Sequence, residues 1–129
     1  LGQMVKVSRE AIAASGVDAE LIDLATVVPW DRKTVWDSVR KTGRLIVVEE
    51  SPQSGGWGSE IVASVTGELF SSLKSAPFRI TAPDVPVPFN GNLEARFIPT
   101  VPDIVRQIQY ALKNQEAPQP WWIFENVLL

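Results

Sequence analysis

The stretch from Leu45 to Ile61 limits the possible folds of this chain more than any other part of the sequence. It begins with four consecutive apolar residues, Leu45 to Val48, continues with Glu49 and Glu50, and then reaches a glycine-rich turn before a periodic apolar segment. A short unbroken apolar run is typical of a strand buried on both faces, as in a parallel sheet covered by helices. The stretch therefore predicts a strand, a turn and a helix at the carboxyl edge of an α/β sheet.

Helical and strand patterns alternate along the rest of the chain. Helical spacing of apolar residues predicts helices over Gln3 to Ser15, from Asp31 to Gly43, over Ser59 to Leu73 and from Thr100 onward, with strands at 19–24, 45–50 and 78–81. This alternation predicts a doubly wound, mainly parallel sheet. We expect one α/β domain over residues 1–114, a linker at 115–120 and an apolar tail at 121–129.

The composition excludes several kinds of site. The chain has no cysteine and no histidine, so it can form no disulfide or zinc–thiolate site and has no imidazole base. Its formal net charge of −3 argues against a nucleic-acid surface, which would need a basic stripe. No apolar run reaches the roughly 18 residues of a membrane span. A cytoplasmic domain is the expectation, or a mitochondrial-matrix one in a eukaryote.

Three carboxylates lie at or near the ends of two predicted strands, namely Asp23, Glu49 and Glu50. Carboxylates at such an edge can hold Mg²⁺, which would make the chain a free-standing enzyme. The alternative interpretation is that these groups are solvated or paired with a nearby cation such as Arg44.

The loop of Gly55, Gly56, Trp57 and Gly58 leads into a helix N-terminus, which could bind a small anion through exposed amides. Glu60 in the first turn would repel such an anion. The alternative interpretation is a tight turn that lets neighbouring chains approach, because glycine has a permissive backbone. Trp57 is a candidate interface anchor, since tryptophan is enriched at binding hot spots.

The proline-rich connection over 82–99 is a second candidate interface, because stiff loops lose little entropy on docking. Its candidate residues are Asp84, Pro86, Pro88 and Phe89.

Several stretches resemble the C-terminal domain of transketolase-like enzymes, above all that of the E1 β subunit of thiamine-diphosphate-dependent 2-oxoacid dehydrogenases. The resemblance runs from about Gly2 to Lys113 and is carried in order by residues 19–24, 29–31, 39–44, 45–61, 76–77, 82–89 and 99–105. It implies a three-layer α/β/α domain with a mixed five-stranded sheet, whose first strand would lie just before Leu1. Members often carry a histidine where this chain has Glu49.

The resemblance implies a role in assembly. In that family, thiamine diphosphate and Mg²⁺ belong to the α subunit and to the N-terminal domain of β. The C-terminal domain packs the E1 β subunits together and shapes the active-site entrance. It also offers a surface to the peripheral subunit-binding domain of the E2 acyltransferase. We therefore predict a non-catalytic, cofactor-free domain, with E1 α, a second E1 β and E2 as partners and with neither nucleic acid nor membrane. The parent enzyme would decarboxylate a 2-oxoacid and pass the acyl group to lipoyl-E2, and the isolated chain would form a homodimer.

The apolar tail contains two strand-forming pieces, Trp121 to Phe124 and Val127 to Leu129. We predict that the tail covers apolar surface at an open sheet edge or on a neighbouring chain. The alternative is that it packs across its own last helix.

Overall fold

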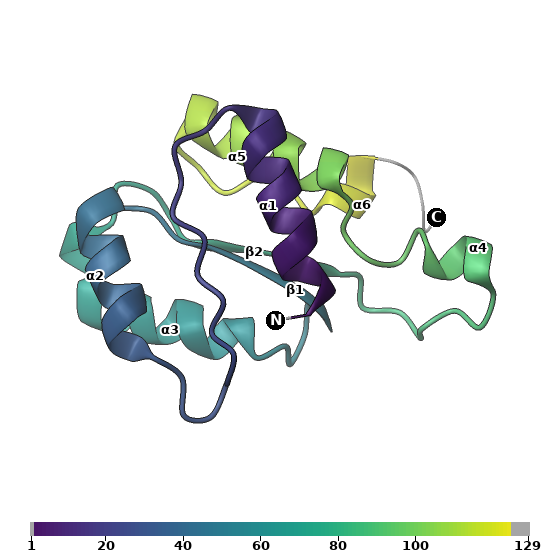
Figure 1. Cartoon of the computed structure of the whole chain (residues 1–129), viewed down its shortest axis with the longest axis horizontal. Coiled ribbons are helices and arrows are strands. Elements are labelled where there is room, and N and C mark those ends of the chain that lie inside the picture. The colour runs from purple at the N-terminus through teal and green to yellow at the C-terminus, as the bar shows by residue number, and fades with distance from the viewer. Residues whose placement is uncertain (1, 125–129) are drawn as a thin grey trace.

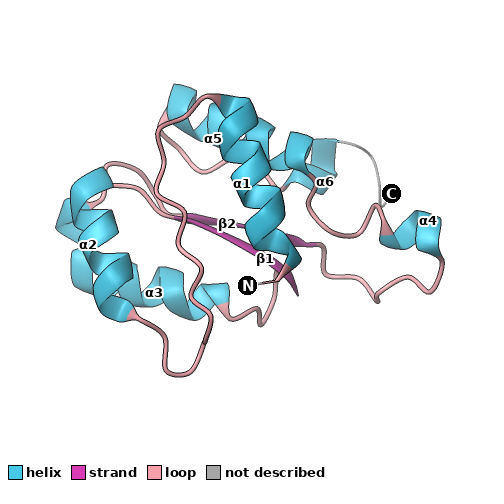
Figure 2. Cartoon of the chain, viewed as in Figure 1, coloured by secondary structure: helices cyan, strands magenta, loops and turns pink. Residues whose placement is uncertain are grey.

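The computed structural model describes residues 2–124, in which two parallel strands lie between two layers of helices (Figure 1). Its elements in chain order are α1 (Gln3–Ser15), α2 (Arg32–Thr42), β1 (Ile46–Pro52), α3 (Gly58–Leu69), η1 (Phe70–Ser72), β2 (Phe78–Ala82), α4 (Gly91–Glu94), α5 (Val101–Asn114) and α6 (Trp121–Phe124). Figure 2 shows α1, α5 and α6 on one side of the strands and α2 and α3 on the other. The α/β class and the three layers are as predicted.

Two hydrophobic clusters fill the spaces between the layers. One joins β1 to α2 and α3 and contains Val35, Val39, Val47, Ile61, Val65 and Leu69. The other joins the strands to α1, α5 and α6 and contains Ala11, Ile80, Ile104, Ile108 and Trp121. Both faces of the strands are therefore covered, which explains why β1 begins with an unbroken apolar run rather than an alternating pattern.

The helix ends follow local capping chemistry. The Asp31 side chain accepts a hydrogen bond from the Thr34 amide at 3.0 Å, and Gly43 ends α2 in the left-handed region with φ 73°. At the start of α5, Asp103 accepts from the Thr100 amide at 3.0 Å, which completes the predicted capping box. These contacts confirm the expected starts of α2 and α5.

The connection between α1 and α2 corrects one prediction, because residues 19–24 form no strand. Within residues 2–124 the sheet has two strands, so the five that the resemblance implies are not present there. A strand is stable only when its backbone groups pair with a neighbour, and β1 pairs only with β2 in this part of the chain. Two further differences are local: α3 ends at Leu69 and passes into η1, and α4 interrupts the proline-rich connection.

The tail also differs from its predicted form. Trp121 to Phe124 form one turn of helix, α6, and not a strand. Trp121 is buried against α5 and β2, and its Nε1 donates to the Thr81 carbonyl at 2.8 Å. The described part of the tail therefore packs, through Trp121, against α5 of its own chain, which was the alternative interpretation. The piece from Val127 to Leu129 lies outside the described residues.

No helix among residues 2–124 combines the length and apolar character needed to span a membrane.

Candidate functional site

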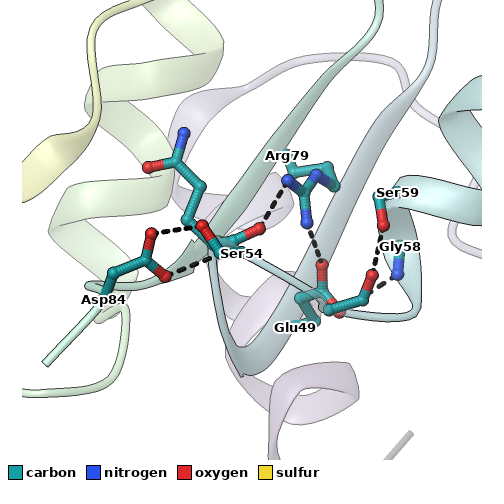
Figure 3. A network of polar contacts seen from close by, with 8 residues as sticks. Glu49, Ser54, Gly58, Ser59, Arg79 and Asp84 are labelled. Carbon is teal, nitrogen blue, oxygen red and sulfur yellow. Dashed lines mark hydrogen bonds and ion pairs between the residues drawn. The ribbon is translucent and has the colours of Figure 1, made fainter. Parts of the chain in front are cut away.

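The candidate site lies where β1 ends, and a buried carboxylate forms its centre (Figure 3). Glu49 shares a face of β1 with Val47, because side chains alternate along a strand. Its carboxylate receives two hydrogen bonds at 3.2 Å, from Arg79 Nη1 to Oε1 and from the Gly58 amide to Oε2. The Glu49 side chain has no exposed surface. It thus links the end of one strand to the neighbouring strand and to the first residue of α3.

Arg79 comes from β2 and closes the network from the other side. The parallel register places Arg79 beside Val47, which lies two residues before Glu49 and on the same face of β1. While Nη1 contacts Glu49, its Nη2 donates to the Gln53 carbonyl at 2.7 Å. The guanidinium therefore holds both the strand-end carboxylate and the loop that follows it.

Close packing against Glu49 explains two of the glycines in this loop. A Cβ atom on Gly58 would lie 2.5 Å from Glu49 Oε1 and 2.8 Å from a methyl group of Val47. One on Gly56 would lie 2.9 Å from the Pro52 carbonyl oxygen. The loop is glycine-rich because it lies directly over Glu49 of the same chain. The anion at the N-terminus of α3 is this internal carboxylate, as the macrodipole favours.

A second contact ties the loop to the proline-rich connection. Asp84 accepts hydrogen bonds from the Ser54 amide and the Ser54 hydroxyl, both at 2.7 Å. These two bonds hold the pKa of the Asp84 carboxyl below its usual range, and the bond from the hydroxyl has the larger effect. Both side chains are exposed, so the contact contributes less than the Glu49 network.

Asp84 predicts a measurable pH dependence. Its pKa is lower in the folded chain than in the unfolded one, so its stabilising effect is complete above the unfolded value, near 3.8. The effect is lost as the pH falls through the lower folded value. Asp84→Asn should therefore melt at a lower temperature than the parent at pH 7, and the two melting temperatures should converge as the pH falls through the folded pKa of Asp84. Ser54→Ala should reproduce this pattern, and a difference that is independent of pH would contradict it.

The other predicted carboxylates do not join the site. Asp23 lies in the irregular connection, where it accepts from the Ala25 amide at 3.2 Å, and Glu50 is exposed on β1. Among residues 2–124 there is no group of three or more aspartate, glutamate, histidine or cysteine side chains that could hold a metal ion. The suggested pairing with Arg44 is corrected as well, because the cation bound to Glu49 is Arg79.

The predicted interface residues come from two segments, the glycine-rich loop and the proline-rich connection, which the Ser54–Asp84 contact joins. Trp57 is half-buried against the cluster between β1, α2 and α3, and Gly55 turns the loop with φ 76°. Pro86 and Phe89 are exposed on the proline-rich connection, whereas Pro88 is half-buried. Phe89 is thus the freely accessible aromatic candidate, while Trp57 contributes mainly to the core.

Arg79 and Ser54 were not among the predicted site residues. The signal for Arg79 was a charged residue inside the apolar strand 78–81, which needs a buried partner of opposite charge. Ser54 has no such signal, because its bond to Asp84 joins two loops that lie 30 residues apart.

Comparisons with known proteins show the family to which this chain is similar. A family model described as transketolase, C-terminal domain, matches residues 1–104. The pyruvate dehydrogenase E1 component subunit beta of Mycoplasma pneumoniae is 48% identical over 93 residues, which are 67% of this chain and 28% of that protein. The mitochondrial subunit of Pisum sativum is 45% identical over 102 residues, covering 79% and 28%, respectively. That of Rhizobium meliloti is 40% identical over 98 residues, covering 76% and 21%. The chain therefore spans 21–28% of the length of these relatives.

Proposed function

This chain belongs to the family of transketolase C-terminal domains, and from that membership we propose that it is the assembly domain of a 2-oxoacid dehydrogenase E1 β subunit. The single observation that carries the proposal is the 40–48% identity to pyruvate dehydrogenase E1 β subunits over two thirds or more of the chain. The whole enzyme would decarboxylate a 2-oxoacid on thiamine diphosphate and transfer the acyl group to lipoyl-E2.

The geometry of the site supports a structural role for the strand edge. Both oxygens of Glu49 are bonded within the chain, to Arg79 and to Gly58, and the carboxylate is shielded from solvent. A general base must reach a substrate proton directly or through one water. Glu49 instead fixes the shape of the loop over 52–58, which is the kind of rigid surface that subunit packing needs.

The proposed partners follow from the same membership. They are the E1 α subunit, a second E1 β subunit and the peripheral subunit-binding domain of E2. The proposed location follows the host: the mitochondrial matrix in a eukaryote, in line with the Pisum sativum relative, and the cytoplasm in a bacterium.

The first test of this function is cofactor binding. Purified alone, the chain should give no saturable heat signal when titrated calorimetrically with thiamine diphosphate and Mg²⁺, and it should not decarboxylate pyruvate. An assembled E1 holoenzyme provides the positive control. A β subunit cut before its C-terminal domain should recover assembly with E1 α when this chain is added. Saturable cofactor binding by the chain alone would contradict the proposal.

Self-association provides a second test. Phe89 is fully exposed and Val87 is 65% exposed on the same connection, so this loop presents apolar surface to solvent. We expect a homodimer at high concentration in sedimentation velocity, and Phe89→Ser should weaken it about tenfold or more because an aromatic anchor is lost. The variant should keep the melting temperature of the parent, since Phe89 has no buried surface. A parent chain that stays monomeric at millimolar concentration would refute the dimer.

A further inference from the structure

The proline-rich connection carries a chemically labile pair of residues that the proposed function does not use. Asn90 and Gly91 form the one Asn-Gly pair of the sequence, as the N-cap and the first residue of α4. Figure 1 shows α4 at one end of the molecule. All residues from 89 to 96 are exposed, and none of the four residues of α4 is buried. The core therefore does not shield the side-chain amide of Asn90 from reaction.

Gly91 provides an unhindered nucleophile next to this amide. Glycine has no Cβ atom, so its backbone nitrogen is the least crowded of any residue. As the first residue of α4, Gly91 has an N–H group without an acceptor inside the helix. A Cβ atom built on Gly91 would meet nothing within 4 Å, which shows that the space around it is open. The nitrogen can therefore approach the Asn90 side chain once the backbone between them turns.

The folded form of α4 restrains both carbonyl groups of Asn90. The side-chain oxygen accepts a hydrogen bond from the Asn92 amide at 3.0 Å, and the backbone oxygen accepts from the amides of Leu93 and Glu94 at 2.9 and 2.8 Å. Asn90 has ψ 127°, and closing a five-membered ring onto the next nitrogen requires the Cα–C bond to turn away from this extended value. The reaction thus needs α4 to open, and a helix of four residues with no buried side chain opens easily.

We propose that Asn90 is a deamidation site whose rate is set by the opening of α4. The Gly91 nitrogen attacks Cγ of Asn90, the bond from Cγ to the side-chain nitrogen breaks, and ammonia leaves with the proton that Gly91 gives up. Water then opens the resulting succinimide at either carbonyl, which yields aspartate or isoaspartate at position 90. Both products place a negative charge directly after the fully exposed Phe89.

Peptide mapping by mass spectrometry tests this reaction in the full chain, incubated in dilute solution at mildly alkaline pH. Asn92 and Asn114 are internal references, because both are exposed and neither is followed by glycine. Asn90 should lose its amide about tenfold faster than either reference, because only its neighbouring nitrogen is unhindered. Aspartate and isoaspartate should both form, and fragmentation by electron transfer distinguishes them.

Two variants separate the nucleophile from the helix. Gly91→Ala should slow the loss at Asn90 about tenfold, because a Cβ atom hinders the attacking nitrogen. Leu93→Pro removes one of the amides that hold the Asn90 carbonyl and disfavours a helical backbone at Asn92, so it should speed the loss about tenfold. Its melting temperature should stay that of the parent, because α4 has no buried residue.

Three kinds of result would overturn the proposal. Equal loss at Asn90, Asn92 and Asn114, or an unchanged rate in Gly91→Ala, would exclude attack by the Gly91 nitrogen. Aspartate as the only product would indicate direct hydrolysis without a ring. An unchanged rate in Leu93→Pro would show that α4 does not control the reaction.

Discussion

Replacing Glu49 with alanine is expected to lower the free energy of unfolding by about 3–5 kcal/mol, the usual effect of removing one partner of a buried ion pair. The Glu49 side chain is completely buried, and that of Arg79 is 18% exposed. Truncation would leave the guanidinium without its counter-charge and the Gly58 amide without its acceptor. Since domains are stable by only about 5–15 kcal/mol, a substantial share of the total would be lost.

Urea unfolding of matched variants can separate this effect from the loss of a side chain. Glu50→Ala is the control, because Glu50 is exposed on the same strand and should change stability by only about 0.5 kcal/mol. Glu49→Gln keeps the size and an acceptor oxygen but loses the charge, so its effect should be intermediate. A double variant, Glu49→Leu with Arg79→Met, should recover part of the loss because no charge stays buried without a partner. If Glu49→Ala were no worse than Glu50→Ala, the network would not stabilise the fold.

The four long helices α1, α2, α3 and α5 were predictable because their signals are local. The bounds expected for α1 are those observed, and the caps at Asp31 and Thr100 form contacts within three residues along the chain. Such signals do not depend on how distant segments pack. The same holds for β1, whose apolar run identifies it as a buried strand wherever it lies in the sheet.

The strand expected at 19–24 shows where sequence reasoning fails. Its composition suits a strand, but a strand also needs a neighbour whose backbone groups pair with its own. In the described structure this segment lines a cavity that also borders β1, and it makes no backbone hydrogen bond to β1. Whether such a segment forms a strand depends on a pairing partner elsewhere in the chain, so the sequence of the segment alone cannot predict it.

Of the two residues at the centre of the candidate site, Glu49 was predicted and Arg79 was not, again because the pairing depends on a distant segment. Glu49 follows an apolar run, which marks it as a carboxylate at a strand end. Its partner Arg79 lies 30 residues away, and only the parallel register of β1 and β2 brings the two together. Arg44 was the expected partner of Glu49 because it is close in the sequence, whereas the partner in the structure is Arg79, which is close in space.

The tail presents the second large expected effect, because a short segment closes over the core. Trp121 is 2% exposed and packs with Ile80, Ile104 and Ile108. Its indole N–H satisfies the Thr81 carbonyl of β2. The approach to α6 is fixed by Gln107, whose side-chain amide donates to the Gln119 carbonyl at 2.9 Å.

Trp121→Ala should therefore lower the free energy of unfolding by about 3–5 kcal/mol, through the cavity it leaves and the lost burial. Trp121→Phe keeps most of the apolar contact but removes the indole N–H, so the Thr81 carbonyl loses its donor and about 1–3 kcal/mol should be lost. Ile123→Ala is the control within α6, because Ile123 is 54% exposed and should change stability by about 0.5 kcal/mol or less.

Urea unfolding and limited proteolysis together decide whether α6 belongs to the folded domain. A chain ending at Asn114 should lose at least as much stability as Trp121→Ala, and its m-value should fall because less surface is buried on folding. In the parent chain, protease should cut between Pro118 and Phe124 only at the rate of global unfolding. Early cleavage there, with an unchanged unfolding curve for Trp121→Ala, would show that the tail does not seal the core. The alanine variant should instead be cut early at this segment, because losing the indole releases α6 before the rest of the domain unfolds.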